Sequence, residues 1–414
     1  MSDESQFPRR QAFSIALASF SNCITSPIFS AFVPLLLSRR FTSTAVIGAI
    51  LTGCNLLSIL AHPLIGGLSD RTGGRFGRRR PYILAGAVVC GLSFACIPRL
   101  ENLIALMLCL CIYCFSIASW RAPTSALMID TIPAPFIGKS NAIMSCMVAA
   151  SSCAAYFLGN IISSMSGQMN LLFGTVGLVC IAAAIAACIG AKETPSPVAS
   201  VRAYVRLLPD PLPKDGRSRL LLLLGMVLTG YIGYSAYEYY FVLFSRNVLD
   251  KPAAFATLLL GLGMVGYLVF SASVSALRRT LPPDKMVRFG ITLLTLLFAA
   301  TFTLSVIRVN GASMLSSASW VLYPFCILCG IGWASFNVFT LPLLLRYSGN
   351  SENGSFMGYF FICTGVAMVF APLLYGIVRD LTQSYATVFL FAALLFSAAR
   401  ICLALSARKE LEQE

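Results

Sequence analysis

Long apolar runs recur along the whole of this sequence. Twelve stretches of mainly apolar residues follow one another, and each approaches the ~20 residues that a helix needs to cross a bilayer. Their centres lie near residues 25, 58, 89, 111, 151, 179, 229, 260, 294, 331, 365 and 394. The chain is 57% hydrophobic and 11% charged, whereas soluble domains are about 25% charged. The pattern predicts an all-α membrane protein with twelve transmembrane helices.

Positive charges indicate the orientation of these helices, because cytoplasmic loops carry more Lys and Arg than outer loops. If both termini are cytoplasmic, 21 of the 30 Lys and Arg residues lie inside, seven lie outside and two lie within spans. We therefore expect a multi-pass protein of a plasma membrane or bacterial inner membrane, with both termini in the cytoplasm. Anionic lipid headgroups account for the net charge of +14, and the sequence contains no nucleic-acid recognition motif.

The apolar runs fall into two groups of six. Between Ala191 and Arg219 the chain turns polar and contains five prolines, which predicts a linker. We expect an N-terminal six-helix bundle at 1–190, a cytoplasmic linker at 191–218 and a C-terminal six-helix bundle at 219–414. Leu158-Gly159 in the first half corresponds to Tyr375-Gly376 in the second, as in a duplicated chain. Pseudo-symmetric bundles of this kind hold a substrate at their interface and expose it to each side of the membrane in turn.

Reactive groups and metal ligands follow no catalytic pattern. Most of the fifteen cysteines lie in apolar runs, where a thiol packs as a small apolar side chain. Because His62 is the single histidine, the sequence does not indicate a zinc site. The sequence has no phosphate-binding loop of the form GxxxxGK[ST], and a serine or cysteine without a base is not a nucleophile. We expect no enzyme activity, no cofactor and no metal, and an ion or solute gradient as the source of energy.

One hydrophilic turn joins the second apolar run to the third. The stretch GGLSDRTGGRFGRRRP, from Gly66 to Pro81, cannot lie in hydrocarbon, where each charge costs roughly 3 kcal/mol or more. Its carboxylate can accept hydrogen bonds from arginines or from the N-terminus of a neighbouring helix. The charged residues of this basic turn are Asp70, Arg71, Arg75, Arg78, Arg79 and Arg80.

The basic turn resembles the loop between the second and third helices of the major facilitator superfamily. Its form SDRxxxRxGRRRP is similar to that of the glycoside-pentoside-hexuronide cation symporters and the related sucrose-proton symporters. Three further passages are similar to these families, namely Asn55 to Gly67, Arg121 to Asp130, and Gly354 to Pro372. The resemblance implies the facilitator fold and transport of a sugar or glycoside with a cation. Two departures, Gly138-Lys139 in place of an arginine and His62 in place of an amide, leave the ion and the solute open.

The resemblance also implies a role for the basic turn. In related transporters, contacts made by this turn close the cytoplasmic side. We therefore expect a conformational gate formed by the six charged residues of the turn together with Asp130, at the end of the fourth span. In the alternative interpretation, the arginines only enforce the topology.

Glu238 is the carboxylate that falls within an apolar run rather than at an end or in a loop. A carboxyl group in an apolar setting can gain and lose a proton near neutral pH. We expect Glu238 to couple transport to a proton. The alternative is a position at the outer headgroup level, since Glu238 follows the start of its run by some eighteen residues.

Arg121 is the matching cation, about 13 Å along a helix from Asp130. A guanidinium offers five donors in a rigid fork, which suits vicinal hydroxyls or a carboxylate. In the resembling sucrose symporters, an arginine at this motif position is implicated in substrate binding or coupling, and we expect the same of Arg121. The alternative is a structural arginine whose donors are satisfied by helix carbonyls.

Polar and aromatic side chains within the spans are candidate solute contacts. Trp333 and Asn337 are four residues apart and share a helical face, where an indole can stack on a sugar ring beside an amide. The alternative for each aromatic residue is packing or a place in the interfacial belt. The expected substrate-binding residues are Asn22, Asn55, Trp120, Arg121, Tyr234, Tyr237, Trp333 and Asn337.

These observations together predict a proton-coupled symporter of a sugar or glycoside that works as a monomer. Sodium is the less favoured coupling ion, because the spans hold few carboxylates to bind it. Two other functions stay open. One is proton-driven export of drugs or metabolites, which would use an apolar cavity with one acidic residue. The other is a membrane sensor or assembly partner that no longer transports.

Overall fold

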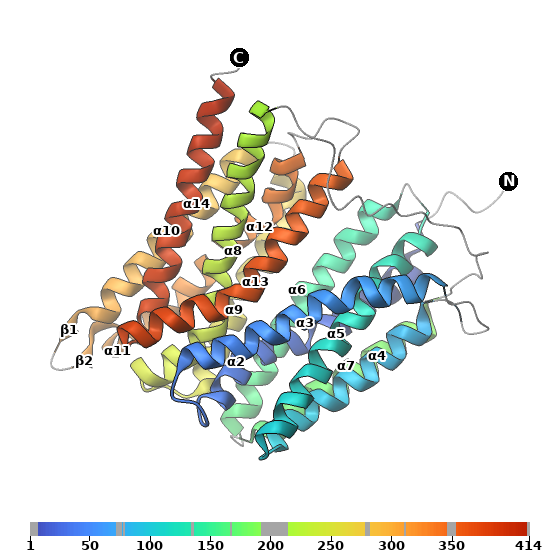
Figure 1. The fold of residues 1–414 in the computed structure, drawn as a ribbon, viewed down its shortest axis with the longest axis horizontal. Helices are drawn as coiled ribbons and strands as arrows, with labels where there is room; N and C mark the ends of the chain where they lie inside the picture. The colour runs from blue at the N-terminus through green and yellow to red at the C-terminus, as the bar shows by residue number, and fades with distance from the viewer. Residues whose placement is uncertain are drawn as a thin grey trace. The chain divides into compact units, whose positions relative to one another are not determined.

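The structure is a computed structural model, and it describes residues 7–71, 77, 79–133, 136–165, 168–191, 214–277, 282–309, 312–345 and 353–411. The described chain is almost entirely helical (Figure 1). Its first part contains α1 (Arg9–Cys23), α2 (Thr25–Leu37), α3 (Thr44–Arg71), α4 (Arg80–Cys96), η1 (Ile97–Arg99), α5 (Leu103–Thr131), α6 (Ile137–Met165) and α7 (Met169–Gly190).

The second part contains α8 (Lys214–Val248), α9 (Ala253–Leu277), α10 (Pro283–Val306), α11 (Met314–Ser317), η3 (Ser319–Val321), α12 (Leu322–Leu345), α13 (Asn353–Thr382) and α14 (Thr387–Leu411). A short hairpin precedes α11, in which β1 (Arg308–Val309) pairs antiparallel with β2 (Ala312–Ser313). The sequence did not predict this hairpin. It lies in a stretch that was expected to be a loop.

The helices confirm the predicted fold class. Among the described residues, eleven helical stretches are long and apolar enough to cross a membrane. The first half of α3, Thr44–Ile59, is a shorter apolar helix. Each of the twelve predicted centres lies within one of these helices.

The first span consists of two helices rather than one. α1 ends at Cys23 and α2 begins at Thr25, with a bend at the buried Ile24. Pro27 explains the bend, because a proline has no N–H to donate to the carbonyl four residues earlier, which here belongs to Cys23. A polar contact lies beside the bend, where the Tyr113 hydroxyl donates to Thr25 Oγ1 at 3.0 Å.

Contacts divide the chain into two compact units. Unit 1 comprises Met1–Ser30 and Gly53–Val201, and unit 2 comprises Ala31–Thr52 and Arg202–Glu414. By their contacts, the last turns of α2 and the first turns of α3 group with the C-terminal helices. The predicted bundles at 1–190 and 219–414 stay predictions. Most of the predicted linker lies outside the described residues, so its role stays a prediction.

Unit 1 packs α4 against α5 and α7, and α1 against α6 and α7. Glycines permit the closest approach, because a Cβ on Gly177 would lie 2.5 Å from the carbonyl oxygen of Gly91. Small polar groups join other helices, as where Ser116 Oγ donates to the Gly86 carbonyl at 2.7 Å. All fifteen cysteines of the chain are free thiols, and those of unit 1 that are buried lie between helices.

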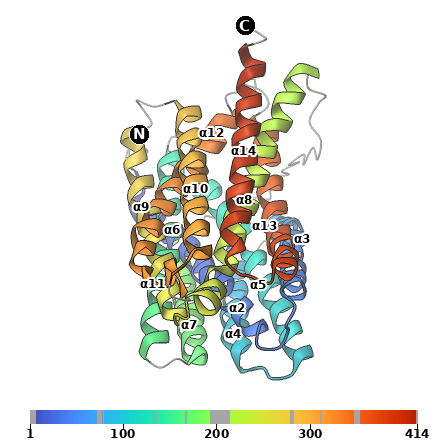
Figure 2. The same ribbon diagram turned by 90° about the vertical axis from the view of Figure 1, so that its left-hand side faces the viewer.

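Unit 2 is built around aromatic side chains. α8 and α14 pack along each other and lie side by side in two views at right angles (Figure 1, Figure 2). α12 packs on both α9 and α10. The rings of Phe298 and Phe396 stack at 5.9 Å, and Phe298 also contacts Phe325 and Phe389. The buried rings gather where α8, α10, α12 and α14 meet.

Candidate functional site

The polar and aromatic groups of α8 gather at one place in unit 2. The ring of Tyr234 stacks face to face on Trp333 of α12, with centroids 3.9 Å apart and planes at 3°. Tyr231 meets the same indole edge-on at 4.9 Å, and Phe360 of α13 lies 6.1 Å from Tyr231. Tyr234 and Trp333 are buried, with 6% and 7% of their surfaces exposed. We call Tyr231, Tyr234, Trp333 and Phe360 the aromatic box.

Glu238 lies one helical turn beyond the aromatic box. It follows Tyr234 by four residues, so the two side chains share a face of α8. Glu238 is half-buried between buried neighbours. It lies five residues past the midpoint of the span Ser218–Val248, or about 7.5 Å along the axis. Its depth in the membrane and its coupling role stay predictions.

The other two predicted contacts of unit 2 differ in exposure. Tyr237 points into the aromatic core, where its ring lies 5.3 Å from Phe298 and its hydroxyl lies 3.6 Å from Cys326 Sγ. Only 2% of its surface is exposed. Asn337 of α12 is half-buried. The structure therefore places Tyr237 in the core and leaves Asn337 accessible.

In unit 1, α1 and α5 bring Asn22 and Arg121 to the same joint. The Asn22 amide donates to the carbonyl of Ile117 at 3.1 Å, one turn before Arg121 on α5. Arg121 lies near Cys23, the residue that follows Asn22, and it is exposed. Pro123, two residues later, deprives the Ser119 carbonyl of its helix donor. Asn22 thus ties the two helices together beside an exposed guanidinium.

Trp120 and Asn55 lie elsewhere in unit 1. Trp120 is fully buried, and a Cβ on Gly86 would meet its side chain at 2.6 Å. Its indole N–H is buried without a hydrogen-bond acceptor among the described residues. Asn55 is half-buried on α3, one residue after the buried Cys54. Both roles in solute binding stay predictions.

One pair of the predicted gate residues is brought together. Arg79 Nε lies 3.1 Å from Asp130 Oδ2, and 6% of the Arg79 side chain is exposed. The pair joins the end of the basic turn to the last turn of α5. Arg80 is the first residue of α4. Asp70 and Arg71 end α3, with side chains that the structure does not describe, and Arg75 and Arg78 lie outside the described residues.

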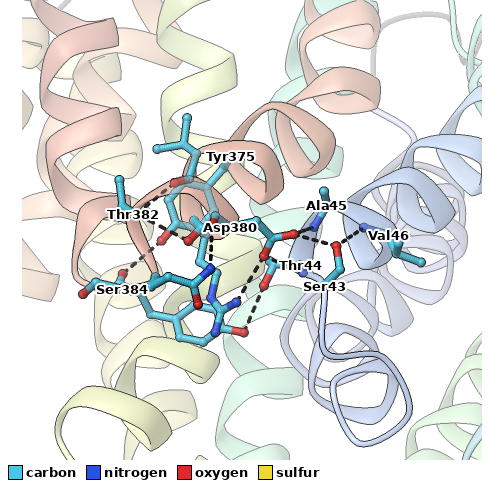
Figure 3. A network of polar contacts seen from close by, with 12 residues as sticks. Ser43, Thr44, Ala45, Val46, Tyr375, Asp380, Thr382 and Ser384 are labelled. Carbon is cyan, nitrogen blue, oxygen red and sulfur yellow. Dashed lines mark hydrogen bonds and ion pairs between the residues drawn. The ribbon is translucent and has the colours of Figure 1, made fainter.

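Sequence reasoning missed Asp380, which is not among the predicted site residues. α13 continues to Thr382, so Asp380 lies in its last turn. Its carboxylate accepts hydrogen bonds from Ser43 Oγ at 2.6 Å and from the Thr44 amide at 2.9 Å (Figure 3). A negative charge at a helix C-terminus is unfavourable by itself, so its position was a signal that another group stabilises it.

Comparison with known proteins identifies the family. The profile of the Major Facilitator Superfamily matches residues 15–372, which is most of the chain. This protein belongs to the major facilitator superfamily. It is thus a membrane transporter rather than an enzyme. No protein of curated function matches the chain in sequence.

Solved facilitator structures have the same fold at low sequence identity. A proton-dependent oligopeptide transporter superposes with a TM-score of 0.73 at 13% identity, covering 97% of this chain and 98% of its own. The nucleoside transporter NupG gives 0.72 at 13%, covering 96% and 99%. A bacterial homologue of the human lysosomal transporter Spinster gives 0.70 at 13%, covering 99% of each chain. These likenesses extend over both halves, and they establish the fold and not the solute.

Proposed function

We propose that this facilitator is a proton-coupled carrier of a small polar solute and that Glu238 carries the proton. The half-buried position of Glu238 within α8 is the observation that supports this most. A charged carboxylate inside the bilayer is costly, and protonation removes that cost. Binding and release of one proton at Glu238 can therefore change which state of the carrier is favoured.

Alternating access determines the direction in which this proton moves. With the site open to the acidic side, Glu238 takes up a proton and the neutral site binds its solute. With the site open to the other side, the proton leaves and the carboxylate regains its charge. The basic turn and Asp130 would act as the cytoplasmic gate, which the ion pair between the buried Arg79 and the exposed Asp130 supports. We place both termini in the cytoplasm and take the monomer as the working unit.

A sugar or glycoside is the solute that we propose. The support is the resemblance of the basic turn and of the Arg121 passage to sugar symporters. The exposed guanidinium of Arg121 offers donors for hydroxyl groups, and the Asn337 amide is accessible on α12. Trp333 stacks on Tyr234, so a sugar ring would have to contact the edge of the indole or displace the tyrosine ring.

A separate observation supports a second candidate function. Glu238 adjoins the aromatic box, and aromatic faces together with a carboxylate attract organic cations. The same proton chemistry would then drive export of a cationic drug or metabolite. The two functions differ in the solute and in the direction in which the proton and the solute move.

Proteoliposomes with an internal pH indicator test these functions. An inward proton gradient is imposed, and monosaccharides, disaccharides, dipeptides and nucleosides are added outside one at a time, whereas a cationic dye is loaded inside. Proton entry that depends on a sugar supports symport. Proton movement only during dye extrusion would replace symport with export. Dependence on a dipeptide or nucleoside would keep proton coupling and overturn the sugar assignment. No proton movement with any solute would overturn the transport proposal and favour a sensor.

A further inference from the structure

The N-terminus of α3 is held by a carboxylate from α13. The amides of Thr44 and Ala45 each donate to Asp380 at 2.9 Å, and the Ser43 hydroxyl donates at 2.6 Å (Figure 3). The first amides of a helix have no acceptor within the helix, and a negative charge at this end is favourable. Asp380 is thus a helix cap supplied by another helix.

Close packing between α3 and α13 continues along the chain after this cap. A Cβ on Gly376 would lie 2.6 Å from the carbonyl oxygen of Thr44, and Gly48 approaches the Pro372 carbonyl. About one helical turn after Gly48, Thr52 Oγ1 donates to the Val369 carbonyl at 2.7 Å. The first two turns of α3 therefore lie against α13 along one seam, which we define as Thr44–Thr52 against Val369–Asp380. Small residues let the two backbones come this close.

A second set of groups surrounds the cap. Arg379 Nη1 lies 3.1 Å from Asp380 Oδ1, and the Arg379 guanidinium lies 4.5 Å from the centre of the Tyr385 ring. The Tyr385 hydroxyl and Thr44 Oγ1 are 3.2 Å apart. The Asp380 side chain is 24% exposed, so water can replace its hydrogen bonds if the cap opens.

The seam ends where α3 passes from one unit into the other. α3 belongs to unit 2 before Gly53 and to unit 1 from Gly53 onwards. Any movement between the units must therefore bend α3 or open the seam. Bending breaks hydrogen bonds inside an apolar helix, where no water replaces them. Opening the cap exchanges bonds at a helix end that water can reach.

We propose that Asp380 is a gating residue, whose cap on α3 forms when one side of the carrier closes and breaks when that side opens. On the predicted topology this is the outer side. The proposal rests on the proposed transport function, because a gate needs a cycle. It differs from the predicted cytoplasmic gate in its residues and in its chemistry, which is a carboxylate on backbone amides rather than an ion pair.

The test measures access to the seam and needs no solute. Thr52→Cys is introduced alone and together with Asp380→Ala, and the proteins are reconstituted into lipid nanodiscs. A membrane-impermeant maleimide is added, and mass spectrometry follows the labelling rate of each thiol. The loss of a helix cap shifts a two-state equilibrium by about five- to tenfold, so we expect Thr52→Cys to react about that much faster without Asp380.

Controls within the same unit separate a gate from a general loss of structure. Asp250→Asn removes an exposed carboxylate, keeps a side chain that tolerates the left-handed backbone at this position, and should leave the rate unchanged. The buried native thiols Cys326 and Cys329 should stay unreactive. Equal labelling of Thr52→Cys with and without Asp380, or a parallel rise at both native thiols, would overturn the proposal. If Asp380→Ala does not fold, Asp380→Asn keeps one acceptor oxygen and should still raise the rate.

Failure of this gate and failure of the proposed function are distinguishable. Faster labelling beside silent proteoliposomes would leave an opening seam in a protein that moves no tested solute. Unchanged labelling beside active proteoliposomes would leave proton-coupled transport and remove Asp380 from its cycle.

Discussion

The two units differ in the contacts that predominate between their helices, although unit 1 also stacks Phe94 on Phe173 and unit 2 also has the Thr52–Val369 hydrogen bond. In unit 1, single polar side chains reach backbone carbonyls of other helices, as Ser21 does to Cys180, Asn22 to Ile117 and Ser58 to Cys114. In unit 2, a continuous cluster of aromatic rings fills the space between α8, α10, α12 and α14. Both are ways to associate helices in lipid, where burial of apolar surface gives no net driving force. The helices of such bundles can thus be joined by scattered hydrogen bonds or by the packing of aromatic rings.

The carboxylates near the ends of the two units also bind different groups. Asp130 of unit 1 binds the guanidinium of Arg79, whereas Asp380 of unit 2 binds the N-terminus of α3. An ion pair between neighbouring parts of one unit stabilises that unit. A cap on a helix that continues into the other unit can respond to movement.

Removing a ring from the aromatic core should have the largest effect on stability. Phe298→Ala deletes a fully buried ring that contacts Tyr237, Phe325, Phe389 and Phe396. Such deletions cost about 3–5 kcal/mol because they leave a cavity. We expect a large fall in the thermal midpoint, followed with a thiol-reactive dye that reports exposure of the buried cysteines. Phe289→Ala on the same helix, where 48% of the side chain is exposed, should change the midpoint little. Equal effects would show that the ring cluster does not hold unit 2.

Closing the gap at a helix crossing of unit 2 should have the next largest effect. A Cβ on Gly330 of α12 would collide with the Gly263 carbonyl of α9, while one on Gly53 would meet no atom within 4 Å among the described residues. Overpacking costs about 1–3 kcal/mol. We therefore expect Gly330→Ala to lower the thermal midpoint and Gly53→Ala to maintain or raise it. A tolerated Gly330→Ala would mean that the rings, and not the crossing, set the helix spacing.

The Arg79–Asp130 pair should contribute a moderate amount to unit 1. Hydrogen bonds to charged groups are worth about 1.5–3 kcal/mol, and removing one partner leaves the other desolvated. We expect Asp130→Asn and Arg79→Gln each to lower the midpoint and the double variant to lower it by less than their sum. A double-mutant cycle measures this coupling. Additive effects would show that the two residues act separately.

A single interhelical hydrogen bond of unit 1 should have the smallest effect. Ser21 is fully buried, and its hydroxyl donates to the Cys180 carbonyl of α7. Interhelical hydrogen bonds in membranes average about 0.6 kcal/mol. We expect Ser21→Ala to lower the thermal midpoint slightly. Ser164→Ala, an exposed serine whose bond lies within its own helix, is the matched control. A loss as large as that of Phe298→Ala would reverse the contrast between the units.

The fold was predictable because the bilayer fixes the length and polarity of each helix. The bend at Ile24 was not predicted, because Pro27 removes a helix donor but Pro123 and Pro372 do the same within unbroken helices. The assignment of residues 31–52 to unit 2 was not predictable either, because it depends on contacts between residues more than 300 positions apart, such as Thr52 and Val369.

The candidate site was predictable in its residues and not in its arrangement. Glu238 and the tyrosines stand out as polar groups in an apolar run. That Tyr234 covers the face of Trp333 depends on how α8 packs on α12. Tyr237 shows the same limit, because its helical position does not reveal that it faces the aromatic core.

Proton flux through a Glu238 variant is the most direct test of the central claim. Wild type, Glu238→Gln and Glu101→Gln are reconstituted in parallel, and proton entry is recorded with the solute that the wild type transports. Glu101 is exposed before α5, so its variant controls for loss of a carboxylate. We predict solute-dependent proton entry in the wild type and in Glu101→Gln, and its loss in Glu238→Gln. Undiminished proton entry in Glu238→Gln would contradict the assignment of Glu238 as the coupling residue.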